Sequence, residues 1–173
     1  IRGQLLHSVK DLTLPHRVRL TLARDGSVHI TVRKLTEEML GQPLTVCFAG
    51  PRVASSNAML RHKTSMRDHF DSVRAEAIKK YGVIDVLFVN EKGGVTEGAI
   101  SNIIAEIDGM LLTPPAECGL LGGIMRQTLL AGHGAVKEAI LSMHDIKHAS
   151  KLFICNSVRE LVPVTLLDVE PVF

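Results

Sequence analysis

Four short segments of the sequence carry residues that folding alone does not require. Lys63 stands just before the expected start of a helix, and Glu97 stands among small residues in a glycine-rich stretch. Two glycines, Gly122-Gly123, lead into a second expected helix, and the polar pair Asn156-Ser157 follows an apolar run. A lysine amine attacks carbonyl carbon, a carboxylate can partner a basic nitrogen, and the free N–H groups of a helix start bind phosphate. Taken singly, each segment also fits a solvated charge, a tight loop, a turn or a helix cap.

The four segments together are more specific than any one of them. An amine for a Schiff base, an acid for a pyridine nitrogen and backbone donors for a phosphate are the parts that hold pyridoxal 5'-phosphate. No metal site is expected, because Cys47, Cys118 and Cys155 are far apart in the sequence and form no short ligand pair. We expect these three cysteines to be reduced thiols.

The same segments resemble a known family. His62-Lys63-Thr64, Val95–Asn102, Leu111–Pro115 and Phe153–Ser157 occur in the order, and with the spacing, of the class IV aminotransferases, the fold type IV pyridoxal-phosphate enzymes. The resemblance covers roughly residues 17–164. It implies an α/β (α+β) fold: the large C-terminal domain of the D-amino-acid-aminotransferase-like fold, a mixed sheet or open barrel with flanking helices.

The resemblance also implies roles for individual residues. Lys63 would be the Schiff-base lysine and Glu97 the partner of the pyridine nitrogen. Gly123, Ile124 and Met125 would form the phosphate-binding turn, and Ser157 would also contact the phosphate. Asn156 and Ile100 would supply backbone groups near the cofactor. Met125 stands where many family members carry a threonine, so only its backbone N–H is expected to contribute.

Finer features favour one branch of the family. The string Gly123-Ile-Met-Arg-Gln127 is closer to 4-amino-4-deoxychorismate lyase than to the transaminases, and the His62-Lys63 region resembles lyase modules fused behind aminodeoxychorismate synthase component I. The expected reaction belongs to folate biosynthesis and forms 4-aminobenzoate and pyruvate. The alternatives are a branched-chain or D-amino-acid transaminase and a non-catalytic fragment or fusion module.

Basic residues beside Lys63 indicate the kind of substrate. Arg61, His62 and Arg67 place positive charge there, which suits an anionic amine with two carboxylates, although the same residues also fit an ordinary solvated face. The family resemblance further implies a homodimer.

Composition excludes several other classes of protein. The chain has 173 residues, 22% of them charged, and a formal net charge of +2 with six aromatic residues, which gives no argument for nucleic-acid binding. No apolar run approaches the roughly 18 residues of a membrane span, and no signal peptide is recognisable. We therefore expect a cytoplasmic protein.

The elements that must position these residues can be read from periodicity and turn signals. Alternating runs predict a hairpin over 17–32, and Asp108-Gly109 predicts a second hairpin. Further strands are expected at 44–49, 84–89, 102–107, 110–113, 151–155 and 161–164, in mixed or predominantly antiparallel pairing, and residues 51–59 are expected to form a loop. A helix is expected from Ser65 to Tyr81, with Ser65 and Asp68 forming a capping box at its start. Two further helices are expected over 124–131 and over 143–148, the latter with Ser142 as its cap.

The length suggests how the chain is divided. We expect residues 1–16 to be the tail of a missing or incomplete small N-terminal domain and residues 17–173 to be the large cofactor-binding domain. Ile1 then marks the edge of the missing domain, which in the family carries an arginine for the phosphate.

Overall fold

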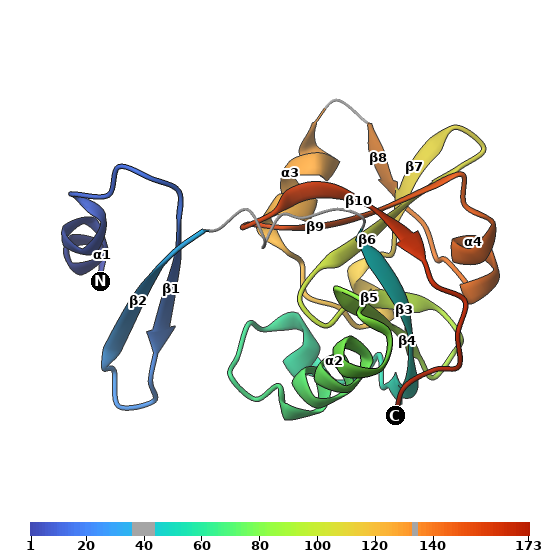
Figure 1. Cartoon of the computed structure of the whole chain (residues 1–173), viewed down its shortest axis with the longest axis horizontal. Coiled ribbons are helices and arrows are strands. Elements are labelled where there is room, and N and C mark those ends of the chain that lie inside the picture. The colour runs from blue at the N-terminus through green and yellow to red at the C-terminus, as the bar shows by residue number, and fades with distance from the viewer. Residues whose placement is uncertain (36–43, 133–134) are drawn as a thin grey trace. The chain divides into compact units, whose positions relative to one another are not determined.

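The computed structural model describes residues 1–35, 44–132 and 135–173 (Figure 1). Contacts divide the chain into two compact units, residues 1–42 and 43–173. This division differs from the boundary expected after residue 16. The hairpin belongs to the first unit, because it contacts the N-terminal helix.

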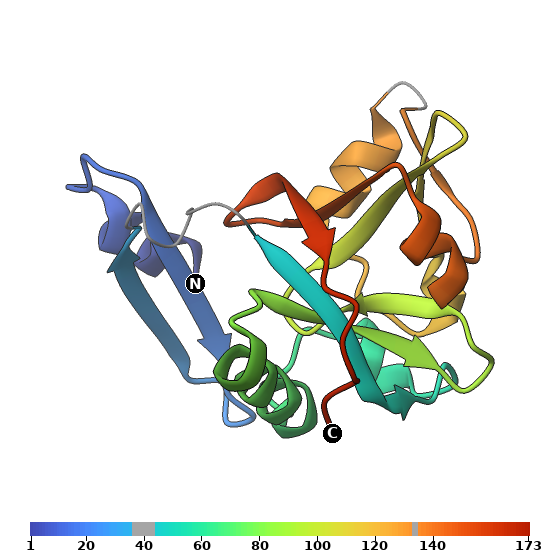
Figure 2. The same cartoon turned by 45° about the vertical axis from the view of Figure 1, so that its right-hand side comes forward.

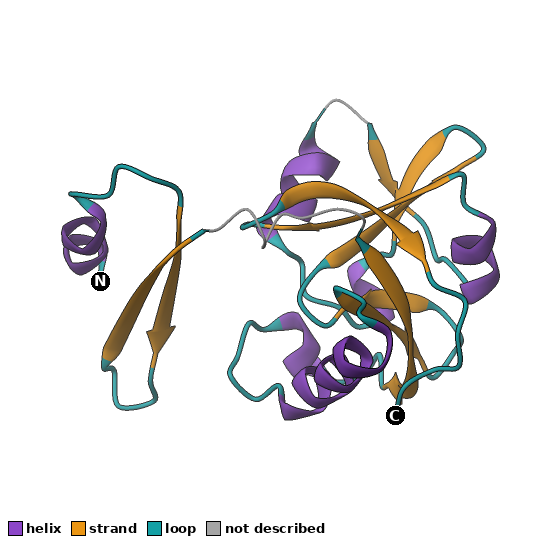
Figure 3. Cartoon of the chain, in the orientation of Figure 1, coloured by secondary structure: helices purple, strands orange, loops and turns teal. Residues whose placement is uncertain are grey.

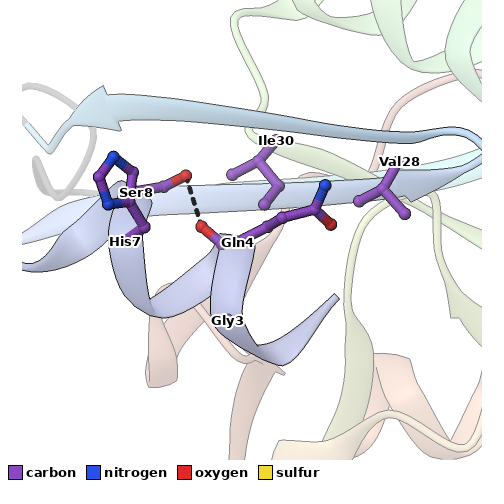
Figure 4. A pocket seen from close by; sticks show the side chains of 6 residues that line it. All are labelled: Gly3, Gln4, His7, Ser8, Val28 and Ile30. Atoms are coloured by element: carbon purple, nitrogen blue, oxygen red, sulfur yellow. Dashed lines mark hydrogen bonds between the residues drawn. The ribbon is translucent and has the colours of Figure 1, made fainter.

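The first unit contains α1 (Arg2–Val9) and the strands β1 (His16–Leu22) and β2 (Val28–Lys34). The two strands pair antiparallel, as predicted, around a turn in which Asp25 accepts the N–H of Ser27 at 2.9 Å. Alternation along the strands separates an apolar face from a polar one. The residues of α1 lie over Val28 and Ile30 of the apolar face (Figure 4).

The second unit is built on an eight-stranded mixed sheet (Figures 2 and 3). Its order is β5-β4-β3-β10-β9-β6-β7-β8, and the pairs β3–β4, β3–β10 and β7–β8 are parallel. The strands span Thr45–Val53 (β3), Asp85–Asn90 (β4), Val95–Gly98 (β5), Asn102–Ile107 (β6), Met110–Thr113 (β7), Val136–Glu138 (β8), Lys151–Asn156 (β9) and Glu160–Leu166 (β10). The predicted mixed α/β class is confirmed, as is the Asp108-Gly109 hairpin between β6 and β7.

Helices flank the sheet. α2 (Asp68–Tyr81) lies beside β3 and β4, α3 (Ile124–Ala131) beside β8 and β9, and α4 (Met143–His148) beside β6. Short 3₁₀ helices occur at η2 (Ala58–Arg61) and η3 (Ala116–Cys118). The predicted ends of α3 are confirmed, and Ser142 caps α4 through a complete capping box with Asp145. No helix in the described part of the chain is long and apolar enough to cross a bilayer.

Two predicted boundaries were wrong. β3 continues through Pro51 to Val53, where a loop was expected, because a register shift between Phe48 and Arg52 accommodates a proline that has no N–H for the ladder. α2 begins at Asp68, and its N-cap residue makes no side-chain cap, so the expected capping box at Ser65 is absent. Local bonds form a turn there instead, in which the carbonyl of Ser65 accepts the N–H of Arg67 at 3.0 Å.

Two strands were missed by the sequence analysis, β5 and β8. β5 forms one edge of the sheet and is covered by the chain that enters α4. The N–H of Val95 donates to the carbonyl of Leu141 at 2.7 Å, and Gly94 bridges to Ser142. This edge strand carries Glu97.

Candidate functional site

Glu97 is almost completely buried, with 7% of its surface exposed. The amide Nδ2 of Asn102 donates to its Oε2 at 3.3 Å. Burial raises the pKa of Glu97 to about 8, whereas a backbone hydrogen bond from Leu121 and the charges of Arg67 and Lys63 act in the opposite direction. The side chain therefore holds a proton in neutral solution and can give it to a stronger base that enters the site.

Lys63 lies in the exposed loop between η2 and α2. Its positive charge lowers the pKa of Glu97, so the fold brings the lysine within electrostatic reach of the buried carboxyl. The two residues come from different parts of the chain, and their use in one cofactor site stays a prediction.

Arg67 is held by contacts within the protein. Its guanidinium donates to the carbonyl of Ala99, lies 5.2 Å from the ring centre of Phe70, and is 3.9 Å from the carboxylate of Asp71. Because Ala99 lies two residues after Glu97, this hydrogen bond from Arg67 helps to fix the backbone that carries the acid. Its expected contact with a substrate stays a prediction.

Arg61 and His62 lie on the surface beside Lys63. Arg61 ends η2, and the backbone N–H of His62 closes that turn by donating to the carbonyl of Met59 at 3.1 Å. Within the described ranges, neither side chain takes part in an ion pair. Both side chains are available to an anionic group that approaches Lys63.

Asn102 connects Glu97 to the glycine turn. Its Nδ2 donates to the carbonyl of Leu121 at 2.8 Å as well as to Glu97. A Cβ atom at Gly123 would lie 2.2 Å from Asn102 Oδ1, so position 123 accepts glycine alone unless Asn102 moves. The acid and the glycine turn therefore form one packed unit.

The N-terminus of α3 is open. Gly123 is its N-cap and supplies no side-chain cap, and the first turn contains no acidic residue. In the part of the chain that the structure describes, the N–H groups of Ile124 and Met125 have no hydrogen-bond partner. Such N–H groups, at the positive end of a helix dipole, favour an anion.

Asp85 organises the turn that follows Glu97. It is completely buried at the start of β4, and its Oδ2 accepts the Ser101 hydroxyl at 2.6 Å and the Ile100 N–H at 3.2 Å. Arg74 Nε lies 3.7 Å from Oδ1. Burial raises the pKa of Asp85 despite these partners, and its charge in turn raises the pKa of Glu97.

Ile100 and Asn156 are brought together by the fold. Asn156 Nδ2 donates to the Ile100 carbonyl at 3.2 Å, and Asn156 Oδ1 accepts the N–H groups of Val158 and Arg159, both at 2.9 Å. The Ile100 N–H is donated to Asp85, and the expected backbone contribution of Ile100 to cofactor binding stays a prediction. Ser157 is exposed in the turn between β9 and β10.

The sequence analysis assigned no role to Asp85 or Asn102. The signal for Asp85 was a carboxylate at the start of a run of buried apolar residues, where an unpaired charge is costly. The signal for Asn102 was an amide at the start of an otherwise apolar strand.

Comparisons with known proteins identify the family of the chain. Residues 4–167 match the family model for amino-transferase class IV. A provisionally named branched-chain-amino-acid aminotransferase from Methanocaldococcus jannaschii is 31% identical over 155 residues, which are 85% of this chain and 46% of the relative. A provisionally named aminodeoxychorismate lyase from Schizosaccharomyces pombe is 25% identical over 171 residues, which are 96% of this chain and 73% of the relative.

Solved structures share the fold. A provisionally named amino-acid aminotransferase from Mesorhizobium loti is 36% identical with a TM-score of 0.86, over 96% of this chain and 80% of the other. A hypothetical aminotransferase from Mycobacterium tuberculosis in its PLP-bound form has a TM-score of 0.77 at 20% identity, over 96% of this chain and 66% of the other. The chain thus spans about half of the M. jannaschii relative and four fifths of the M. loti protein.

Proposed function

Since the chain belongs to the class IV aminotransferase family, we propose that it binds pyridoxal 5'-phosphate through Lys63 and Glu97 and acts as a 4-amino-4-deoxychorismate lyase. The observation that carries the proposal is the buried Glu97, which Asn102 joins to the glycine turn before α3 and whose pKa burial raises to about 8. The products would be 4-aminobenzoate and pyruvate.

The residues fit the cofactor chemically. Gly123 packs directly against Asn102, and within the described ranges the two backbone N–H groups that follow it at the start of α3 have no hydrogen-bond partner. A phosphate group satisfies such donors. In this arrangement Gly123, Ile124 and Met125 would hold the phosphate together with Ser157, and Lys63 would hold the cofactor covalently through Nζ.

Each protein group then has a definite task. When bound, pyridoxal phosphate supplies an electron-withdrawing ring that acidifies the C–H bond next to the substrate amine. Glu97, whose carboxyl holds a proton, would be the partner of the ring nitrogen. Once the substrate amine has replaced it on the cofactor, the released Lys63 Nζ would move a proton to and from carbon as general base and acid. Arg61 and His62 would attract the carboxylates of an anionic substrate.

Two activities of the family compete. The lyase is supported by the Gly123-Ile-Met-Arg-Gln127 string and by the S. pombe relative, which aligns with 96% of this chain. Of the two transaminase alternatives, the branched-chain one is supported by the higher identity of the M. jannaschii relative. We favour the lyase because the Gly123–Gln127 string and an alignment over nearly the whole chain point to the same branch.

Borohydride reduction in the presence of pyridoxal phosphate, followed by peptide mapping, tests the site. A stable tag on Lys63 is expected, and the Lys63→Ala variant should lose it. Lys92→Ala removes another exposed lysine and should leave the tag in place. A tag spread over surface lysines, or no tag, would contradict the proposed site.

The reaction is tested separately. Pyruvate release from 4-amino-4-deoxychorismate without an added keto acid supports the lyase. Keto-acid-dependent amino transfer without pyruvate release from that substrate would instead identify a transaminase.

A further inference from the structure

A basic surface in the first unit lies outside the site described above. One face of the β1–β2 hairpin presents three arginines, a histidine and two threonines: Arg17, Arg19, Thr21, His29, Thr31 and Arg33. We call these six residues the basic face. They line a shallow hollow of about 250 Å³.

The opposite face of the hairpin is apolar, and α1 covers part of it. Val28 and Ile30 point toward α1, where they lie near Gln4 and Ser8 (Figure 4). Because successive residues of a strand alternate between faces, the basic face points away from this helix. In the described part of the first unit, its guanidinium groups are therefore open to a ligand.

The pairing of the strands makes this face electrostatically unfavourable when it is empty. Arg17 stands directly opposite Arg33, and Arg19 stands opposite Thr31. Like charges directly opposite one another in a sheet destabilise it. Within the described ranges, no carboxylate forms an ion pair with Arg17, Arg19 or Arg33. A bound anion would remove this repulsion.

The geometry of the charges indicates the class of ligand. Arg17 and Arg33 are about 5 Å apart at their Cβ atoms, as cross-strand partners are. Arg19 follows Arg17 on the same face after about 6.8 Å of strand. The guanidinium group of arginine binds carboxylate and phosphate groups through bidentate hydrogen bonds. One oxyanion can thus lie between Arg17 and Arg33 while a second meets Arg19, with threonine hydroxyls as further donors.

We propose that the basic face of the β1–β2 hairpin binds a small ligand that carries two oxyanion groups, either carboxylates or phosphates. This inference does not depend on the proposed function, because the basic face belongs to the first unit and uses none of the residues assigned to the cofactor.

Titration of the full chain, followed by NMR of the labelled protein, tests the proposal with three probes: succinate, inorganic pyrophosphate and acetate. Saturable shifts confined to the hairpin are expected with succinate or pyrophosphate. Acetate should bind at least about tenfold more weakly, since it can form only one of the two charge-assisted contacts. Tighter binding of succinate indicates a dicarboxylate source, and tighter binding of pyrophosphate a phosphorylated one.

Matched variants separate a site from general attraction. Arg19→Gln should weaken succinate and pyrophosphate at least about tenfold. Arg24→Gln removes the same charge at the hairpin turn, outside the basic face, and should leave both affinities within about twofold. Equal weakening by the two variants, equal affinity for acetate and succinate, or no saturable binding would overturn the proposal. Binding of a single-stranded oligonucleotide without any response to the small anions would also overturn it.

A second readout distinguishes binding from folding. Arg17→Gln relieves the repulsion from Arg33, so hydrogen exchange of the hairpin amides should slow in the empty protein. Added succinate or pyrophosphate should slow the same amides in the wild type and have much less effect in the variant. Faster exchange in the empty variant would show that Arg17 stabilises the hairpin and would contradict the proposed repulsion.

Discussion

The α-carbon of Gly123 lies against the side-chain amide of Asn102 so closely that a methyl group at position 123 would stand 2.2 Å from Oδ1. The same amide donates to Glu97 and to the carbonyl of Leu121. The start of α3 and the buried acid are therefore positioned by one side chain.

Gly123→Ala should disturb both parts of the site. Asn102 must turn away from the added methyl group and give up its hydrogen bonds, which we expect to cost about 1–3 kcal/mol. Urea unfolding measures the loss, and titration with pyridoxal phosphate should show weaker binding. Gly122→Ala is the matched control, because its Cβ would contact only the end of the Gln127 side chain, at 3.3 Å. Equal effects at the two glycines would refute the argument.

The stability of the ligand-free protein should depend on Glu97 in a defined pH range. The folded pKa is about 8 and the ordinary value is near 4.5. The unfolded chain therefore loses this proton first as the pH rises, and wild-type stability falls between these values. Each unit of pKa difference corresponds to about 1.4 kcal/mol. Glu97→Gln lacks this titration, so its stability relative to wild type should rise from pH 4.5 to about 8 and then level off. Parallel pH profiles would be the contrary result.

Two basic residues should act on the same proton to different extents. The charges of Arg67 and Lys63 both lower the pKa of Glu97, and Arg67 has the larger effect. Arg67→Gln should therefore raise that pKa more than Lys63→Gln does. Carbon NMR of the Glu97 carboxyl during a pH titration measures both changes. Arg61→Gln serves as the comparison and should leave the pKa near its wild-type value. A larger rise in the Lys63→Gln variant would contradict this order of effects.

Asp85 should be much more important for stability than an exposed aspartate. Asp85→Ala leaves Arg74 and the Ser101 hydroxyl without their buried partner, and we expect a loss of about 3–5 kcal/mol. Asp71→Ala removes an exposed carboxylate that is 3.9 Å from Arg67, and it should cost at most about 1 kcal/mol. Urea unfolding of both variants provides the comparison. A similar cost for the two would mean that the buried network contributes little.

The three cysteines should be protected in the folded protein. Cys47, Cys118 and Cys155 are buried and free, and burial raises the pKa of Cys47 and of Cys155 to about 11. Because the thiolate is the reactive form, a thiol reagent at neutral pH should react slowly with the native protein and rapidly in urea. Rapid reaction of all three without urea would contradict the burial.

Local patterns were enough to predict the elements whose ends are marked by turn residues. Asp108-Gly109 and the glycines at 122–123 and 132 set the limits of β6, β7 and α3 correctly. β5 was missed because Val95–Gly98 contains a threonine, a glutamate and a glycine in place of an apolar run, and its pairing with β4 is a tertiary effect.

The candidate site was predictable only in part. Lys63 and Glu97 could be proposed from residue type and family resemblance, but the burial of Glu97 follows only from the fold. The use of the Ile100 N–H by Asp85 could not be foreseen, because it depends on how the turn after β5 meets the start of β4. The bond between Arg67 and the Ala99 carbonyl is equally a product of tertiary packing.

The position of Glu97 on an edge strand also bears on aggregation. An open strand edge can recruit strands from other molecules. β5 is only four residues long, the N–H of Val95 is already donated to Leu141, and Gly94 is bridged to Ser142. The segment that enters α4 thus pairs with the outer side of β5 at its N-terminal end. This pairing protects the strand that carries the acid from pairing with a neighbouring molecule.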